Sequence, residues 1–343
     1  MGTRIKDIAR RAKVSEATVS LVLNQKPGVS TLTRERILKL AREMDYGATQ
    51  RQVLSTRTGT IRFLKIATHG HTVNRDHNVF IADYIDGLTR SARSLGYNLE
   101  VSAFRGAGVE EIISSVRGAS LKGMVVLGTE LGPEAVQSFE QLSLPFVFLD
   151  TYYDFLPFDF VDMNNKDAVH DIIMHLVDNG HEHLGFVRSP VNTHNFFLRD
   201  EGFYQTVAEL GMNIPPRDIF NVDSTFDGSY RDMLELTSGR SEMPSALFCT
   251  NDIMAYGTIK ALRRHGWEVP GDISVVGFDD LPLSAVMDPS LTTMQVSKKK
   301  MGEMAVQLLS MRIENEETGP PMKIQVGGEL IVRESVRNLS NGR

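Results

Sequence analysis

Apolar residues recur at helical spacing in three short stretches near the start of the chain. The first covers residues 5–12, and the second ends at Leu23 behind Ser15, a residue type that caps helix N-termini. The third covers residues 33–44, after a loop that contains Pro27-Gly28. Two short helices joined by a tight turn and buttressed by a third predict a helix-turn-helix unit, which places its second helix in the major groove of DNA.

From Ile61 onward the pattern changes to short apolar runs that alternate with amphipathic stretches. The runs predict strands at 61–67, 98–104, 123–127, 145–149, 183–187, 246–249, 274–277 and 322–331. The stretches between them predict helices near 80–95, 109–117, 133–142, 166–179, 199–210, 228–236, 252–265 and 298–315. This alternation indicates parallel sheets, and the number of strands favours two doubly wound lobes. Two facing lobes bring the carboxyl ends of their strands to a common cleft, where open α/β sheets bind ligands.

Charge is distributed unevenly between these two regions. The 343-residue chain has a net charge of −6, yet residues 1–60 carry +7 and the remainder −13. A basic segment attached to an acidic one is expected of a small polyanion-binding module on a separate carrier. We therefore expect a DNA-binding head at 1–46, a hinge at 47–60 and a two-lobed effector-binding and dimerisation body at 61–343.

Several functional classes are disfavoured by the sequence. The single cysteine, Cys249, cannot form an intramolecular disulfide, and neither a secretory signal nor a membrane-spanning apolar run is present, so we expect a cytoplasmic protein. No dinucleotide-binding, P-loop or nucleophile-elbow motif occurs at a strand–helix junction. The pairs His69/His71 and His181/His183 lack the further ligands of a metal site. We expect no enzymatic activity, no cofactor and no metal.

The motifs of the head resemble those of the lactose-repressor (LacI/GalR) family. The matching residues are Ile5-Lys6-Asp7-Ile8-Ala9, Val14-Ser15-x-x-Thr18-Val19-Ser20-x-Val22-Leu23-Asn24, Val29-Ser30 and Thr33-Arg34. The resemblance continues through the body, for example in Arg199-x-x-Gly202-Phe203, Thr250-Asn251-Asp252 and residues 273–280, and covers about 1–337. It implies an all-α helix-turn-helix head on an α/β body of two doubly wound parallel-sheet lobes, like those of periplasmic sugar-binding proteins.

The resemblance implies two groups of DNA contacts. Glu16, Ala17 and Leu21 would face bases, whereas Lys6, Ser15, Thr18, Ser20 and Asn24 would contact phosphates. Many relatives have Arg or His at the position of Leu21, and leucine cannot form the bidentate hydrogen bonds that arginine makes with guanine. We therefore expect an operator half-site that lacks this guanine. At the turn, where the family usually has Gly or Asn, a positive φ at Lys13 would cost on the order of 1 kcal/mol.

The hinge differs from the family pattern. In the family a short hinge helix inserts a leucine into the minor groove and kinks the duplex. Counting from Tyr46 places this position at Ser55, and counting back from Ile61 places it at Val53. Leu54 lies between them and is our prediction; the alternative is a polar tether with one incidental leucine.

The resemblance also implies an effector site made of Asp150, Arg199, Asn251 and Asp279. Asp150 and Asp279 each follow a predicted strand, and carboxylates, a guanidinium and an amide together suit the hydroxyl groups of a polyol. Phe80 and Phe226 are expected to stack on the apolar face of a sugar, although Phe226 fits an ordinary core position equally well.

These features predict a sequence-specific DNA-binding regulator, in its simplest form a repressor controlled allosterically by a small sugar-like effector. The alternative is a ligand-responsive activator or a corepressor-dependent regulator that binds a non-sugar metabolite. A transport-linked solute receptor is disfavoured by the basic head and the missing signal. We expect a homodimer on palindromic double-stranded DNA, because the eight residues after Ser335 are too few for a tetramerising heptad tail.

Overall fold

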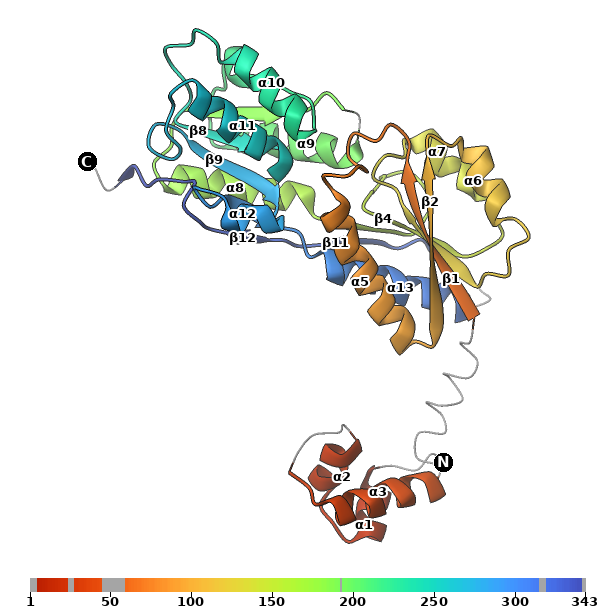
Figure 1. Cartoon of the computed structure of the whole chain (residues 1–343). Helices are drawn as coiled ribbons and strands as arrows, with labels where there is room; N and C mark the ends of the chain where they lie inside the picture. Colours follow the sequence, from red (N-terminus) through yellow and green to blue (C-terminus); the bar gives the residue numbers. More distant parts are fainter. Residues whose placement is uncertain (1–4, 24–27, 45–58, 192, 315–318, 341–343) are drawn as a thin grey trace. The chain divides into compact units, whose positions relative to one another are not determined.

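The structure is a computed structural model that describes residues 5–23, 28–44, 59–191, 193–314 and 319–340 (Figure 1). The chain divides near Gly59 into two compact units. Within the described ranges, no helix is long and apolar enough to cross a membrane.

The head consists of three helices. They are α1 (Ile5–Ala12), α2 (Glu16–Leu23) and α3 (Thr31–Glu43). Their shared core contains Ile8, Ala9, Ala12, Val19, Val22, Ile37 and Ala41, which are the residues that the helical spacing predicts to face inward. Arg36 of α3 donates a hydrogen bond to the carbonyl oxygen of Ala12 and so ties α3 to the end of α1.

A Schellman turn joins α1 to α2. The N–H of Val14 donates to the carbonyl of Ala9, and the N–H of Lys13 donates to that of Arg10. Lys13 adopts a φ of 53°, so the expected positive φ at this turn is present on a residue with a Cβ. At the start of α2, the hydroxyl oxygen of Ser15 accepts a hydrogen bond from the N–H of Thr18, which confirms Ser15 as the N-cap.

The first lobe of the body is a six-stranded sheet in the order β11-β5-β4-β3-β1-β2. Its strands are β1 (Gly59–Ala67), β2 (Tyr97–Arg105), β3 (Gly123–Leu127), β4 (Phe146–Leu149), β5 (Phe160–Met163) and β11 (Lys323–Val326). Its helices are α5 (Asn78–Ser94), α6 (Val109–Val116), α7 (Pro133–Gln137) with the short η1 (Ser138–Gln141), and α13 (Lys298–Glu314). β1 and β3 pair in parallel with Phe63 opposite Val125, as the near-continuous apolar run of β3 predicts for a strand covered on both faces.

The second lobe repeats this arrangement in the order β12-β10-β9-β8-β6-β7. Its strands are β6 (Leu184–Arg188), β7 (Ile219–Asn221), β8 (Ala246–Cys249), β9 (Ser274–Asp279), β10 (Thr292–Gln295) and β12 (Glu329–Ile331). Its helices are α8 (Asn165–Asp178), α9 (His194–Glu209), α10 (Phe226–Leu236), α11 (Asp252–Arg264) and α12 (Pro282–Val286), with η2 (Pro216–Asp218) before β7. β12 runs antiparallel to β10. The other neighbouring strands pair in parallel: β7 with β6, β6 with β8, β8 with β9, and β9 with β10.

The topology fixes where a ligand can bind. Without β11 and β12, the strand orders are β2-β1-β3-β4-β5 and β7-β6-β8-β9-β10. In each sheet the first strand along the chain lies between the second and the third, which is a doubly wound order. Such a sheet has its switch point beside the carboxyl end of its first strand, which is β1 in one lobe and β6 in the other. The chain passes between the lobes three times, from β5 to α8, from β10 to α13 and from β11 to β12.

Two helices of the first lobe pack closely against each other. α5 and α13 lie side by side (Figure 1). A Cβ on Gly87 of α5 would lie 2.1 Å from the carbonyl oxygen of Lys299, and one on Gly302 of α13 would lie 2.6 Å from that of Tyr84. The two glycines therefore permit a backbone contact that no larger residue allows.

The predicted two-lobed α/β fold is confirmed, but several elements differ from the pattern-based expectation. β5, β7 and β10 were not predicted, because β5 carries Asp162, β7 has three residues and β10 is mostly polar. The strand predicted at 322–331 is split into β11 and β12, one in each sheet. α9 begins five residues before its predicted start, because Thr193 caps it by accepting the N–H of Phe196.

Candidate functional site

A cavity of about 40 Å³ lies between the two lobes at the carboxyl ends of their strands. It is lined by Thr72, Val73, His77, Phe80, Ile81, Thr129, Asp150, Thr193, Asn195, Phe196, Arg199, Asn251 and Asp279. These residues follow β1, β3 and β4 in the first lobe and β6 and β8 in the second, or end β9. The cavity therefore occupies the position that the switch points of the two sheets predict.

Asp150 is the polar centre of the first lobe's side of the cavity. It follows β4, is 6% exposed and has a φ of 62°. Its carboxylate accepts hydrogen bonds from the hydroxyl of Tyr84 at 2.8 Å, the amide of Asn195 at 3.1 Å and the hydroxyl of Thr129. Burial raises the pKa of Asp150, and these donors oppose the rise.

Arg199 and Asp279 form the second lobe's side. Arg199 donates to the side-chain oxygen of Asn165 and to the carbonyl of Thr250, and its guanidinium lies 3.6 Å from the centre of the Phe278 ring. A terminal nitrogen of Arg199 is 3.5 Å from Oδ1 of Asp279. Burial raises the pKa of Asp279 to about 7, against the attraction of Arg199. Asp279 also has a φ of 119°, so two cavity carboxylates are held on strained backbone, as often occurs at functional sites.

His77 and Asn251 connect the lobes. The side-chain oxygen of Asn251 accepts the N–H of Met254 at the start of α11, so its amide group is the donor to Nε2 of His77 at 3.2 Å. Nδ1 of His77 then carries the proton, facing the side-chain oxygen of Asn74 at 3.2 Å. Burial lowers the pKa of His77 to about 4, which keeps the imidazole neutral near pH 7.

Two further pairs of residues form hydrogen bonds between the lobes. Asn195, in the first turn of α9, donates to Asp150 across the cleft. Ser224, after β7, donates to the carbonyl of His71 at 2.9 Å. With the His77–Asn251 pair, they form what we call the latches of the cleft.

The loop that carries His71 is built around a single buried carboxylate. Glu130 accepts hydrogen bonds from the backbone N–H groups of His69, Gly70, Thr72 and Val73 and from the hydroxyl of Thr72. Burial alone would raise the pKa of Glu130, but the N–H donors overcome it and lower the pKa to about 2. This ionised carboxylate fixes the loop that forms one wall of the cavity.

Five of the six effector residues expected from the sequence, namely Phe80, Asp150, Arg199, Asn251 and Asp279, line this one cavity. Phe226 does not line it. Its ring lies 5.0 Å from the ammonium of Lys260, because Phe226 is the first residue of α10, beyond the Thr225 cap. Ser224, two residues earlier, is the residue of this segment that reaches the other lobe.

Sequence reasoning missed several lining residues, including Thr129, Thr193, Asn195 and Phe196. Thr193 carried a usable signal, since threonine is a preferred N-cap and the correct start of α9 would have placed Asn195 at the cleft. His77 carried none, because its partner Asn251 lies 174 residues away.

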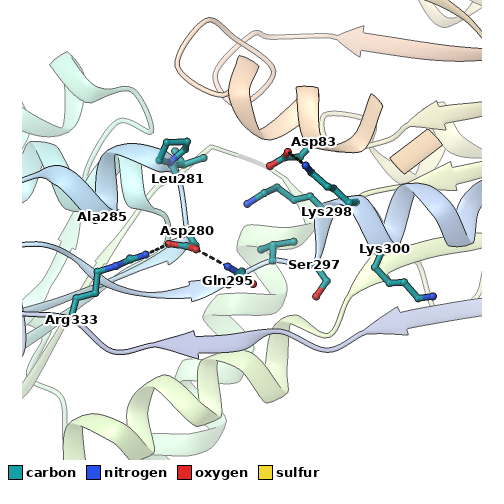
Figure 2. Close-up of a pocket in the computed structure, with 12 residues that line it drawn as sticks. Asp83, Asp280, Leu281, Ala285, Gln295, Ser297, Lys298, Lys300 and Arg333 are labelled. Carbon is teal, nitrogen blue, oxygen red and sulfur yellow. Dashed lines mark hydrogen bonds and ion pairs between the residues drawn. The ribbon is translucent and has the colours of Figure 1, made fainter. Parts of the chain in front are cut away.

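A second cavity, of about 450 Å³, lies beside α5 and α12 (Figure 2). Asp280 accepts hydrogen bonds there from Arg333 and Gln295, and Asp83 pairs with Lys299. Lys298 links the two cavities, because it lines this one while its ammonium bonds to the backbone oxygen of Asp279. Four cationic side chains line it against two acidic ones, so this face of the body is locally basic.

The head presents the expected DNA-reading residues at its surface. Lys6, Ser15, Glu16 and Ala17 are exposed, and Thr18, Ser20 and Leu21 are partly exposed. Glu16 and Ala17 open α2, so they lie at the helix end that contacts base edges in helix-turn-helix proteins. Asn24 and Leu54 lie outside the described residues.

A three-helix DNA-binding head followed by two α/β lobes that close on a polar cavity defines a ligand-responsive transcriptional regulator. The chain is similar to the LacI family of bacterial regulatory proteins. Residues 4–48 match the model of that family, and residues 173–336 match the model of a periplasmic binding protein-like domain.

Similar proteins extend over nearly the whole chain. The HTH-type transcriptional repressor PurR of Aliivibrio salmonicida (strain LFI1238) is 29% identical, over 98% of this chain and 99% of its own. The HTH-type transcriptional repressor CytR of Escherichia coli (strain K12) is also 29% identical, over 98% of this chain and 96% of its own. A CelR–cellobiose complex shares the fold with a TM-score of 0.72 at 23% identity, over 97% of this chain and 99% of its own. A Lac repressor dimer bound to operator and the anti-inducer ONPF also shares the fold, with a TM-score of 0.71 at 22% identity. The match covers 98% of this chain and 100% of that chain.

Proposed function

We propose that this regulator is a cytoplasmic repressor whose affinity for a palindromic operator is controlled by a small, hydroxyl-rich effector bound between the lobes. The observation that carries the proposal is the convergence of Asp150, Arg199, Asn251 and Asp279 on one cavity. These four residues come from four separate segments, and their carboxylates, guanidinium and amide suit vicinal hydroxyl groups. Relatives named as repressors and a structural neighbour that holds cellobiose support the same assignment.

Effector entry requires the lobes to separate. A cavity of about 40 Å³ is far below the roughly 300–1,000 Å³ of typical ligand sites. Separation breaks the Asn195–Asp150 and Asn251–His77 hydrogen bonds and bends the three crossings between the lobes. A ligand that favours one lobe arrangement shifts the population towards it, and this shift is the proposed signal to the head.

DNA recognition is assigned to α2 and its surroundings. We propose that Glu16, Ala17 and Leu21 meet bases and that Lys6, Ser15, Thr18, Ser20 and Asn24 meet phosphates. Leu54 is proposed as the hinge residue that enters the minor groove. Because phosphate contacts release counterions, operator affinity should fall steeply as salt increases.

We further propose that two protomers pair through the body. α12 exposes Leu283 and Val286, the latter 77% exposed, and α5 exposes Val79. α5 and α12 both border the second cavity, so these apolar side chains belong to neighbouring elements. The neighbour named as a Lac repressor dimer supports pairing, and a dimer supplies the two heads that a palindrome needs.

The test combines a ligand screen with operator binding. The full chain is screened by thermal shift against monosaccharides, disaccharides, sugar acids and amino sugars, and each stabilising compound is added to an operator-binding titration. We expect a stabilising compound to change operator affinity and Arg199→Ala to abolish this change. Phe80→Ala is the second variant, because loss of Arg199 also removes hydrogen bonds inside the second lobe. A stabilising ligand that still changes operator affinity in both variants would place the effector site elsewhere.

A further inference from the structure

The cleft contains more buried carboxylates than cations. Asp150 and Asp279 line the cavity at 6% and 4% exposure, and Asp162 is fully buried behind them on β5. Asn165 lies between Asp162 and the cavity residue Arg199. Its amide nitrogen is 3.5 Å from the Asp162 carboxylate, and its side-chain oxygen accepts a hydrogen bond from Arg199. Among the residues that line the cavity, Arg199 is the one with a permanent positive charge.

The side-chain hydrogen bonds that these carboxylates accept come from neutral groups, although the charges of Arg199 and Lys298 lie near Asp279. The three side chains that donate to Asp150 are Tyr84, Thr129 and Asn195, all of them neutral. None of the described residues donates a hydrogen bond to Oδ1 of Asp279, which lies 3.5 Å from a terminal nitrogen of Arg199. Burying an ionised carboxylate without a hydrogen-bonded cation is unfavourable in free energy. This penalty raises the pKa values of Asp150, Asp162 and Asp279.

Two phenylalanine rings complete the arrangement. Phe80 and Phe196 line the cavity beside the carboxylates. The ammonium of Lys298 already lies 4.9 Å from the centre of the Phe80 ring, and the guanidinium of Arg199 lies 6.0 Å from that of Phe196. Aromatic faces together with carboxylates are the groups that recognise an organic ammonium.

From this arrangement we infer that the effector carries a positively charged amine, as in an amino sugar or another aminopolyol, which Asp150 and Asp279 bind beside Phe80 and Phe196. The inference rests on the proposed effector site and narrows its ligand class. The same charges disfavour sugar acids and phosphorylated sugars, whose anionic groups would face the carboxyl groups of Asp150 and Asp279.

Binding of an ammonium should release protons from the protein. The groups that face Asp279 are Arg199 of α9, Asp252 of α11, Lys298 of α13 and Asp150 after β4. Those that face Asp150 are Tyr84, Arg199, Asp162 and Asp279. Because burial raises the pKa of Asp279 to about 7, this carboxyl group is partly protonated without ligand, so affinity for the amine should rise from about pH 5.5 to pH 7 as it ionises.

The experiment compares matched sugars on the full chain by calorimetry at pH 7. The sets are glucose, glucosamine and glucuronate, and galactose, galactosamine and galacturonate. We expect the amine of at least one set to bind about tenfold or more tightly than its neutral counterpart. Calorimetry in two buffers of different ionisation enthalpy should show proton release for that amine. A neutral sugar or sugar acid that binds more tightly than its amine, or the absence of binding by either amine, would overturn the inference.

Asp279→Asn separates charge recognition from a structural role. Asparagine keeps a hydrogen-bonding side chain of the same size, so the amine should lose about tenfold in affinity while the neutral sugar changes far less. Equal losses for both ligands would contradict charge recognition. Asp171→Asn, on the exposed side of α8, is the matched control and should change neither affinity. A neutral sugar that releases the operator would overturn this inference and leave the proposed function standing.

Discussion

At the scale of single residues, Lys13 shows how the fold tolerates local strain. Its φ of 53° closes the turn between α1 and α2 at a position where glycine would carry no penalty. We expect Lys13→Gly to stabilise the head by about 1 kcal/mol, measured by hydrogen exchange of the α1 amides in the full chain. The same substitution at Lys39, exposed in the middle of α3, should instead destabilise it by about 1 kcal/mol. Destabilisation by both substitutions would contradict this account of the turn.

Leu21 should determine one base of the operator. Leucine offers only an apolar contact, such as one to a thymine methyl, whereas arginine would hydrogen-bond to guanine. Selection from random DNA should therefore yield half-sites without a dominant guanine at the position that Leu21 faces. Leu21→Arg should introduce that guanine, and Leu21→Ala should relax the position without doing so. An unchanged selected sequence for Leu21→Arg would show that this side chain does not face a base.

Glu130 should contribute strongly to the stability of the body. Glu130→Gln replaces an acceptor of five hydrogen bonds by a side chain with one oxygen, so we expect a loss of about 2 kcal/mol in the free energy of unfolding. The pKa of Glu130 is lowered to about 2, so its contribution is present above its ordinary pKa of 4.5 and is lost as pH falls towards 2. Denaturant unfolding across this pH range, with exposed Glu134→Gln as control, tests both points. A loss that persisted unchanged at pH 2 would contradict the assignment.

How far the sequence predicts the site depends on the kind of contact. The family resemblance implied Asp150 and Asp279, and their positions at the carboxyl ends of predicted parallel strands agreed with a place at the ligand edge of the sheet. The Asn195–Asp150 and Asn251–His77 latches were not predicted, because they depend on how two separately folded lobes close. Phe226, the first residue of α10, does not line the cavity, and its contact with an effector stays a prediction.

At the scale of elements, hydrophobic patterning predicted long, amphipathic or fully apolar segments and missed short polar ones. The apolar run at 123–127 became β3 without change. β10, with the sequence Thr-Thr-Met-Gln, lies in the sheet because tertiary hydrogen bonds bury it: Thr293 donates to Asp252, and Thr292 bonds to Ser335 and Arg333. Such pairing is invisible to a periodicity argument.

α12 provides an element-scale test of pairing. Val286→Glu places a charge on its exposed apolar surface, which should shift the protein towards monomers and weaken operator binding about tenfold or more. Sedimentation gives the oligomeric state, and anisotropy of labelled operator gives the affinity. Leu236→Glu changes another exposed apolar residue, at the end of α10, and should alter neither. A Val286→Glu protein that remains dimeric would move the proposed interface elsewhere.

At the scale of the whole molecule, the two units differ in net charge and in expected role. The +7 of residues 1–60 favours DNA, whereas the −13 of the remainder disfavours close approach of the body to phosphates. A single head carries modest charge, so pairing of two heads and low salt should both strengthen binding. The body's contribution is then control of the head through its cleft.

The most direct test of this control is a titration of labelled operator with the full chain, repeated with a saturating stabilising sugar, for the native protein and for Asn251→Ala. Asn251 lines the cavity and lies in the body, so it has no role in the head's DNA-reading surface. We expect the ligand to change the operator affinity of the native protein about tenfold or more, and to leave the affinity of Asn251→Ala unchanged. An operator affinity that is the same with and without every ligand that stabilises the native protein would contradict the account.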